Sequence, residues 1–142
     1  MNIVENTNIN NFENIINKKS EYESDCLEFF LCINSFMENE KISPFYLISN
    51  QGRIYDIYTE KFIPINNDGT VELICLPYYY GDICKKKIFS IDNLMMGIFK
   101  ATNHIMKFYK QFDYKIIHKD NNSDNHNLSN LYCKIVNPYC IK

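Results

Sequence analysis

Five short segments rich in β-branched and aromatic residues follow one another between residues 45 and 89, and they constrain the fold more than any other feature. Turn-forming residues, mainly Asn, Gly and Asp, separate them. Segments this short, divided by such residues, are typical of antiparallel strands joined by tight turns, so we expect a small β meander. The segments are FYLI, GRIYDI, KFIPI, TVELICL and KKIF.

Residues 25–38 have apolar side chains at helical spacing. Asp25 can cap the first turn, and Glu28 three residues later completes a capping box. We expect a helix here. It either packs on the core of the protein or, because the segment is acidic and amphipathic, binds a protein partner. The apolar residues are Phe29, Cys32, Ile33, Phe36 and Met37.

A second helical pattern covers residues 92–109, with Ser90 as its candidate N-cap and an apolar stripe along one side. After it, DYKIIH and NLYCKI are predicted to form two strands joined by a densely polar loop. The expected fold class is therefore α+β. It combines an N-terminal helix, a small antiparallel β meander, a central helix and a final pair of strands.

Charge is distributed unevenly along the chain. Residues 1–40 contain eight acidic residues and two lysines, a balance of −6. Residues 41–142 contain nine acidic and thirteen basic residues, a balance of +4. The second part is therefore suited to contact a polyanion such as DNA, whereas the first part would repel one.

The six cysteines include no C-x-x-C pair, so the usual pattern of a zinc knuckle is missing. The N-terminus lacks the basic start and apolar run of a signal peptide, and no apolar stretch reaches the ~18 residues of a membrane span. We therefore expect reduced thiols in an intracellular protein, of the cytoplasm or the nucleus, that makes no membrane contact.

Residues 116–131, IIHKDNNSDNHNLSNL, resemble the first two-thirds of the HNH motif of homing endonucleases. That motif runs roughly H-x-D-G, a short polar spacer, N-N, three further residues and N-L. The spacing of the matching side chains, more than their type alone, makes the resemblance specific. The matching positions are His118, Asp120, Asn125, His126, Asn130 and Leu131.

The upstream sequence extends this resemblance to residues 42–136. YLISNQGRIYDIYTEKFIPINNDGTVELICL is similar to the sheet-forming DNA-binding module that often precedes these nucleases, and KKIFSIDNLMMGIF resembles the segment that follows it. The implied organisation is an acidic extension with one helix at 1–41, the β module plus a helix at 42–110, and a truncated HNH-like ββα motif at 111–142.

The resemblance also implies roles for two residues. His118 corresponds to the general base that takes a proton from the attacking water, and Asn130 to the residue that orients its imidazole. Members of the family use one divalent ion, Mg²⁺ or Mn²⁺, to neutralise the phosphate and the leaving oxygen. Its ligands are the residue before the histidine and a residue about nine positions after the asparagine.

This chain departs from the family at both ligand positions. Ile117 precedes His118, and isoleucine cannot bind a hard cation, which requires oxygen ligands. Tyr139 stands at the second ligand position. In addition, Asp92 replaces a usual His upstream, and Asn121 replaces a usual loop Gly. We therefore expect no metal ligands and a degenerate centre without nuclease activity, with no cofactor unless cleavage survives.

Three functions are consistent with these observations. The first is an HNH-derived protein, of viral or mobile-element origin, that still binds DNA through phosphate contacts. The second is a structural component of a larger assembly, such as a virus particle or a nucleoprotein complex, recruited through the 25–38 helix. The third is an active nicking endonuclease with replacement metal ligands.

The candidate residues for these functions fall into two groups. The candidate DNA contacts are Arg53, Lys85, Lys86, Lys87, Lys107, Lys110, Lys115 and Lys119. The candidate replacement ligands are Asp113, Asp120, Asp124 and His126.

Overall fold

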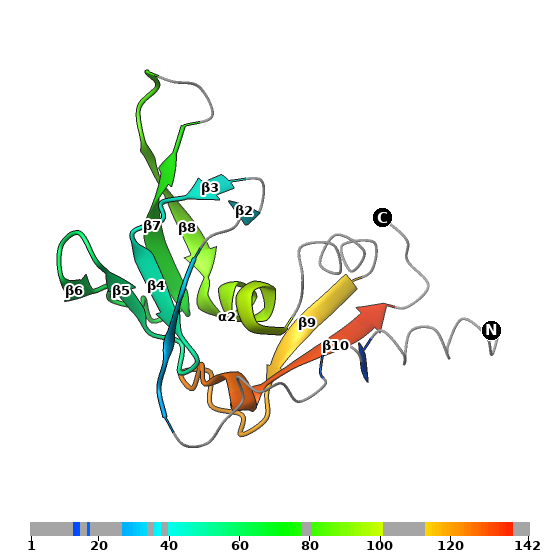
Figure 1. The fold of residues 1–142 in the computed structure, drawn as a ribbon. Coiled ribbons are helices and arrows are strands. Elements are labelled where there is room, and N and C mark those ends of the chain that lie inside the picture. Colours follow the sequence, from blue (N-terminus) through cyan, green and yellow to red (C-terminus); the bar gives the residue numbers. More distant parts are fainter. Residues whose placement is uncertain are drawn as a thin grey trace.

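The computed structural model describes residues 13–14, 17, 27–33, 36–37, 40–77, 81–100 and 113–137. These residues form two four-stranded antiparallel sheets, a two-stranded hairpin, a short helical segment at residues 91–100 and a 3-10 turn, Leu128–Asn130. Glu13, Asn14 and Asn17 are also helical. Figure 1 shows the helix α2 between the sheets and the hairpin formed by β9 and β10. The helix therefore joins the two parts of the chain that resemble the DNA-binding module and the HNH motif.

The first sheet has the strand order β1-β4-β5-β6. Side chains of β4 and β5 alternate: Tyr46, Ile48, Ile54 and Asp56 are buried, whereas Leu47 and Tyr55 are partly exposed. This period of two is the reason that the predicted segments form strands. The strands are β1 (Phe30–Cys32), β4 (Tyr46–Ser49), β5 (Ile54–Asp56) and β6 (Lys61–Phe62).

The second sheet has the strand order β2-β3-β7-β8, so the predicted meander is divided between two sheets. Pro64 lies in the connection after β6. Because proline lacks a backbone N–H, it cannot continue a ladder of hydrogen bonds, and β7 pairs with β3 and β8 instead. The strands are β2 (Phe36–Met37), β3 (Glu40–Ile42), β7 (Thr70–Leu76) and β8 (Lys85–Ser90).

The N-terminal helix predicted at residues 25–38 is wrong. The described part of this segment contains β1, which pairs with β4, and β2, which pairs with β3. Cys32 is exposed and its neighbour Ile33 is fully buried, as expected where side chains of an extended chain point to opposite faces. The apolar residues of this segment also recur every three or four positions, which is the pattern that predicted a helix. Pairing with β4 therefore overrides the local helical pattern.

The central helix predicted at residues 92–109 is not a regular α-helix over its described part. The helical segment consists of α2 (Ile91–Met95) and a π-helical turn (Met96–Lys100), and residues 101–112 lie outside the described residues. The predicted cap is confirmed, because Ser90 Oγ accepts a hydrogen bond from Asn93 N at 3.3 Å. The fold is thus mostly β, not the α+β arrangement with two helices.

The two strands predicted after the helix are confirmed as β9 (Asp113–His118) and β10 (Leu131–Asn137). Two residues from the start of the chain bind along β10. Glu13 Oε1 accepts from Ile135 N at 2.8 Å, and Asn17 bonds the N–H and C=O of Cys133 at 2.9 and 2.8 Å. These side chains satisfy backbone groups at the edge of the hairpin.

One continuous apolar core joins the sheets, the helix and the hairpin. Tyr46 contributes a polar group to it, and its hydroxyl accepts a hydrogen bond from Ile74 N at 3.0 Å. Among the described residues, no helix is long and apolar enough to cross a membrane. The fully buried core side chains include Ile33, Ile48, Ile54, Leu73, Ile91, Leu94, Met95, Leu128 and Leu131.

Candidate functional site

His118 is the last residue of β9, opposite Leu131 on β10. The chain then turns sharply, with Asn121 N donating to His118 O at 3.0 Å. Asn121 has a φ of +60°, the left-handed conformation that glycine favours and that asparagine tolerates. The replacement of the family's usual glycine by Asn121 is therefore compatible with the same tight turn.

No hydrogen bond joins the side chains of Asn130 and His118 in this structure. Its side-chain Nδ2 donates to the backbone carbonyl of Asn125 at 2.9 Å and to Asp120 Oδ1 at 3.0 Å, and its Oδ1 accepts from Asp120 N at 3.0 Å. The Asn125 carbonyl also faces His118 Nδ1 at 2.9 Å. Asn130 therefore fixes the carbonyl that in turn fixes the imidazole.

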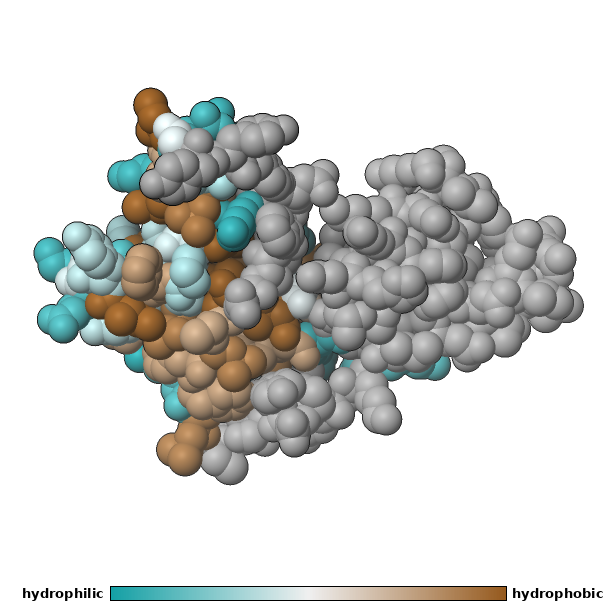
Figure 2. Space-filling view, turned by 45° about the horizontal axis from the view of Figure 1, so that its top comes forward, coloured by the Kyte–Doolittle hydropathy of each residue, from teal (hydrophilic) through white to brown (hydrophobic). Residues whose placement is uncertain are grey.

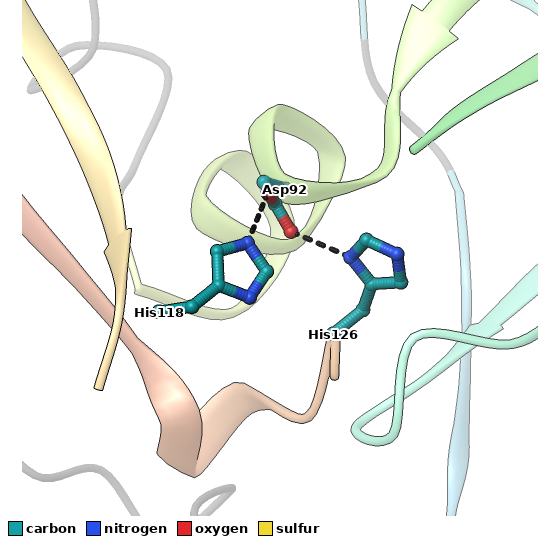
Figure 3. Close-up of side chains that lie close together, drawn as sticks. All are labelled: Asp92, His118 and His126. Carbon is teal, nitrogen blue, oxygen red and sulfur yellow. Dashed lines mark hydrogen bonds and ion pairs between the residues drawn. The ribbon is translucent and has the colours of Figure 1, made fainter. Parts of the chain in front are cut away.

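Asp92, in the first turn of α2, lies between two histidines (Figure 3). Its Oδ2 is 2.7 Å from His118 Nε2, and its Oδ1 is 2.8 Å from His126 Nδ1. The two imidazole rings meet edge to face, with centroids 5.6 Å apart. The first turn of α2, the end of β9 and the loop before β10 thus meet at one carboxylate.

His126 is buried because two glycines of the β module leave room for it. A β-carbon on Gly52 would lie 2.5 Å from the Cβ of His126, and one on Gly69 would lie 3.4 Å from its Cε1. Backbone hydrogen bonds hold these segments together, including Leu128 N to Asn50 O at 2.9 Å and Ile91 N to Gly69 O at 3.0 Å. The β module therefore forms one wall of the site.

The pKa of His118 is raised by its surroundings. Partial burial opposes the charged ring, but the Asp92 carboxylate and the Asn125 carbonyl both stabilise it, and their combined effect is larger. A carbonyl oxygen only accepts hydrogen bonds, so Nδ1 carries a hydrogen. The contact between Nε2 and the Asp92 carboxylate favours a second hydrogen on Nε2, which is the imidazolium form of His118.

A polar cleft of about 330 Å³ opens beside Asp92. The residues that line it are Ser90, Asp92, Asn93, Lys115 and Ile116. It brings one carboxylate and one lysine together at the junction of α2 and β9, and it gives small polar ligands access to Asp92.

Arg53, a candidate DNA contact, is engaged within the protein. Its Nε and terminal nitrogen bind both oxygens of Glu28, and its guanidinium lies 4.1 Å above the ring of Phe62. Ser49 Oγ supports the same turn by donating to Glu28 and accepting from Arg53 N. The ion pair therefore fastens the segment before β1 to the turn before β5.

The candidate lysines are spread over two regions. On β8, Lys85 and Lys87 share one face of the strand, and Lys86, on the other face, lies 3.7 Å from Glu72. Lys115 and Lys119 are exposed on and just after β9. Lys107 and Lys110 lie outside the described residues, as does Tyr139.

Sequence reasoning missed the association of Asp92 and His126 with His118. Asp92 is a departure upstream, 26 residues before His118, and no spacing rule connects the two. His126 lies in the same motif as His118, but only as a conceivable replacement ligand. The one sequence signal that could have linked Asp92 and His126 to His118 is that both side chains are titratable and can bind a metal ion. Of the other conceivable replacement ligands, Asp120 and Asp124 are exposed in the loop, and Asp113 is the first residue of β9, opposite Asn137 and at the far end of the strand from His118.

No protein-family model and no curated protein matches this chain. The chain is similar to a solved structure described as "DNA binding and cleavage by the HNH homing endonuclease I-HmuI". The identity is 24%, the TM-score is 0.43, and the match covers 68% of this chain and 51% of that one, so this chain spans about half its length. The matched protein is of the kind that residues 42–136 resemble.

Proposed function

We propose that this protein binds nucleic acid on an HNH-like scaffold and does not cleave it. The observation that carries the proposal is the position of Asp92 Oδ2, 2.7 Å from His118 Nε2. In a general base, that nitrogen needs a free lone pair directed at the attacking water. Here it faces a carboxylate instead of solvent.

The protonation of His118 supports the same conclusion. With hydrogens on both nitrogens, the imidazolium has no lone pair with which to accept a proton from water. The raised pKa makes this state more populated near neutral pH than it is for a free histidine. A histidine in this state stabilises the fold through its two hydrogen bonds.

The divalent ion of the HNH family does not fit the residues in its usual place. Ile117 stands where the family has a ligand, and its apolar side chain is partly buried in the hairpin. A hard cation such as Mg²⁺ requires oxygen ligands and gains nothing from an alkyl group. Without that ion, the charge on the phosphate and the leaving oxygen is not neutralised.

Exposed lysines near the cleft provide the groups for phosphate contacts. Lys115 lines the cleft beside Asp92, and Lys119 follows β9 on the same hairpin. Lysine-to-phosphate contacts release counterions, so the affinity should fall steeply as salt increases and depend little on base sequence. The Arg53 side chain is already paired with Glu28 and is a weaker candidate for such contacts.

A binding and nicking experiment tests this function. Purified protein is titrated against a labelled DNA duplex at low and moderate salt, and the same protein is incubated with supercoiled plasmid and Mg²⁺ or Mn²⁺. We expect salt-sensitive binding that Lys115→Ala combined with Lys119→Ala weakens, and no nicking. Undetectable duplex binding at low salt would overturn the proposal, as would nicking that His118→Ala abolishes.

A role in a larger assembly is the second candidate. The described part of the segment predicted as a partner-binding helix forms the strands β1 and β2, but apolar surface is exposed over the sheets (Figure 2). Phe45 is 52% exposed and Tyr58 80% exposed, and their rings are 5.9 Å apart. Light scattering after gel filtration tests this candidate: an assembly lost in the double change Phe45→Ser and Tyr58→Ser would favour it.

A further inference from the structure

We propose that Asp92, His118 and His126 bind one transition-metal ion of the zinc class. Each residue offers one ligand atom, and these three atoms lie within 4.8 Å of one another. They come from α2, from the end of β9 and from the loop before β10, so a bound ion would cross-link three parts of the fold (Figure 3). This inference does not depend on nucleic-acid binding.

The donor set selects the class of ion. Two imidazole nitrogens and one carboxylate oxygen suit Zn²⁺, Co²⁺ or Ni²⁺, which accept nitrogen ligands readily. Mg²⁺ and Ca²⁺ instead require a shell made almost entirely of oxygen atoms. The ligands also differ from the family's ion site, because Ile117 is not among them and His118 serves as a ligand, not as a base.

The present distances allow an ion to enter with small movements. The Asp92 oxygens are 2.7 and 2.8 Å from the two nitrogens, which are hydrogen-bond distances. Tetrahedral ligands ~2.1 Å from a zinc ion lie ~3.4 Å apart, so the carboxylate has to move less than ~1 Å away from each nitrogen. The two nitrogens, which lie within 4.8 Å of each other, have to reach the same spacing. An ion at this point would replace the hydrogens that now lie between the carboxylate and the two rings.

The outer contacts of His118 match those of a metal-binding histidine. Such a histidine usually donates its other ring N–H to a carbonyl or a carboxylate, which fixes the tautomer and the orientation of the ring. Here His118 Nδ1 faces the carbonyl of Asn125 at 2.9 Å, and Asn130 Nδ2 holds that same carbonyl. This leaves Nε2 as the nitrogen directed at Asp92 and at the ion.

The cleft beside Asp92 gives access to a fourth ligand. The three side chains are 21%, 13% and 8% exposed for Asp92, His118 and His126 respectively, so the cluster is shielded but not sealed. Of the three ligands, Asp92 lines the cleft, so a water molecule or a phosphate oxygen would reach the ion from the side of Asp92 and Lys115. A site with three protein ligands and one open position is a known arrangement for zinc.

Cobalt spectroscopy on the full chain tests the site. Co²⁺ is added to metal-free protein, and visible absorption is recorded; Zn²⁺ is then added as a competitor, and heat of binding is measured separately. We expect visible bands with a stoichiometry of one, displaced by Zn²⁺. Asp92→Asn and His126→Gln should abolish the bands, whereas Asp124→Asn, an exposed carboxylate of the same loop, should leave them unchanged.

Nitrogen NMR of histidine-labelled wild-type protein provides a second readout that requires no variant. Zn²⁺ should shift His118 Nε2 and His126 Nδ1 far more than His118 Nδ1. The proposal is overturned by the absence of binding, by bands that survive both ligand changes, or by a near-ultraviolet thiolate band that places the ion on cysteines. Because no nucleic acid is present, these outcomes are separate from those of the DNA-binding test.

Discussion

Gly52 is packed directly against His126, so that a β-carbon at residue 52 would lie 2.5 Å from the histidine Cβ and 3.0 Å from its carbonyl oxygen. Gly52 also has a φ of +82°, where an L side chain is strained. We expect Gly52→Ala to lower the free energy of unfolding by roughly 2–4 kcal/mol, as the sum of backbone strain and overpacking. Urea denaturation measures this difference.

Gly81 provides the matched control for this change. Its φ is +93°, but a β-carbon there would meet nothing within 4 Å. Gly81→Ala should therefore cost only the backbone term, roughly 1–2 kcal/mol. Equal losses of unfolding free energy in both variants would mean that the clash with His126 adds nothing to the cost of Gly52→Ala.

The buried side chain of Asn130 should matter more for stability than the exposed asparagines of the same loop. Asn130→Ala leaves Asp120 N and the Asn125 carbonyl without their side-chain partner, and we expect a loss of about 2–3 kcal/mol. Asn122→Ala removes only an exposed acceptor of Asp124 N and should cost less than about 1 kcal/mol. Denaturation of the two variants checks this, and similar costs would contradict the proposed support of the loop.

Residues close together in the sequence were predicted better than residues that meet only in the folded chain. Five strands between residues 45 and 89, the Ser90 cap and the β9–β10 hairpin follow from alternation and turn residues, which act locally. The segment at 25–38 failed because its spacing fits a helix, whereas the free edge of β4 recruits it as a strand. The edge exists only after the sheet has formed.

The candidate site was predicted in the same way as the fold: the residue types of the motif were found, but the contacts between them were not. His118 and Asn130 were identified by their spacing, yet their connection runs through the backbone carbonyl of Asn125, which no side-chain pattern encodes. Asp92 lies 26 residues before His118, and only the packing of α2 against the hairpin brings them together. A pattern that defines the residue types of a site therefore does not define which of their atoms remain available for chemistry.

The Glu28–Arg53 ion pair should make stability depend on pH in acid. The hydrogen bond from Arg53 lowers the pKa of Glu28 below its usual value of 4.5, despite an opposing effect of partial burial. A lowered folded-state pKa means that the stabilisation is fully present above the unfolded pKa. It is lost as pH falls through the folded pKa.

Denaturation of wild type and Glu28→Gln from about pH 7 to pH 3 checks this expectation. The wild type should be more stable at neutral pH, and the two curves should converge in acid. Glu72→Gln is the control, since that exposed carboxylate lies 3.7 Å from Lys86 and its removal should leave the curve nearly unchanged. A constant difference between wild type and Glu28→Gln at every pH would contradict a charge-dependent role.

The thiols should differ in reactivity according to their burial. Cys133 lies on β10 and is 2% exposed, and burial raises its pKa to about 11. Because the thiolate is the reactive form, Cys133 should be alkylated slowly at pH 8 in the folded protein. Cys32 and Cys84 are exposed and should be labelled before Cys133. Peptide mapping after a short pulse of iodoacetamide measures this, and unfolding in urea should remove the difference.

Rapid labelling of Cys133 without urea would mean that the edge of β10, where Asn17 bonds the Cys133 backbone, opens readily.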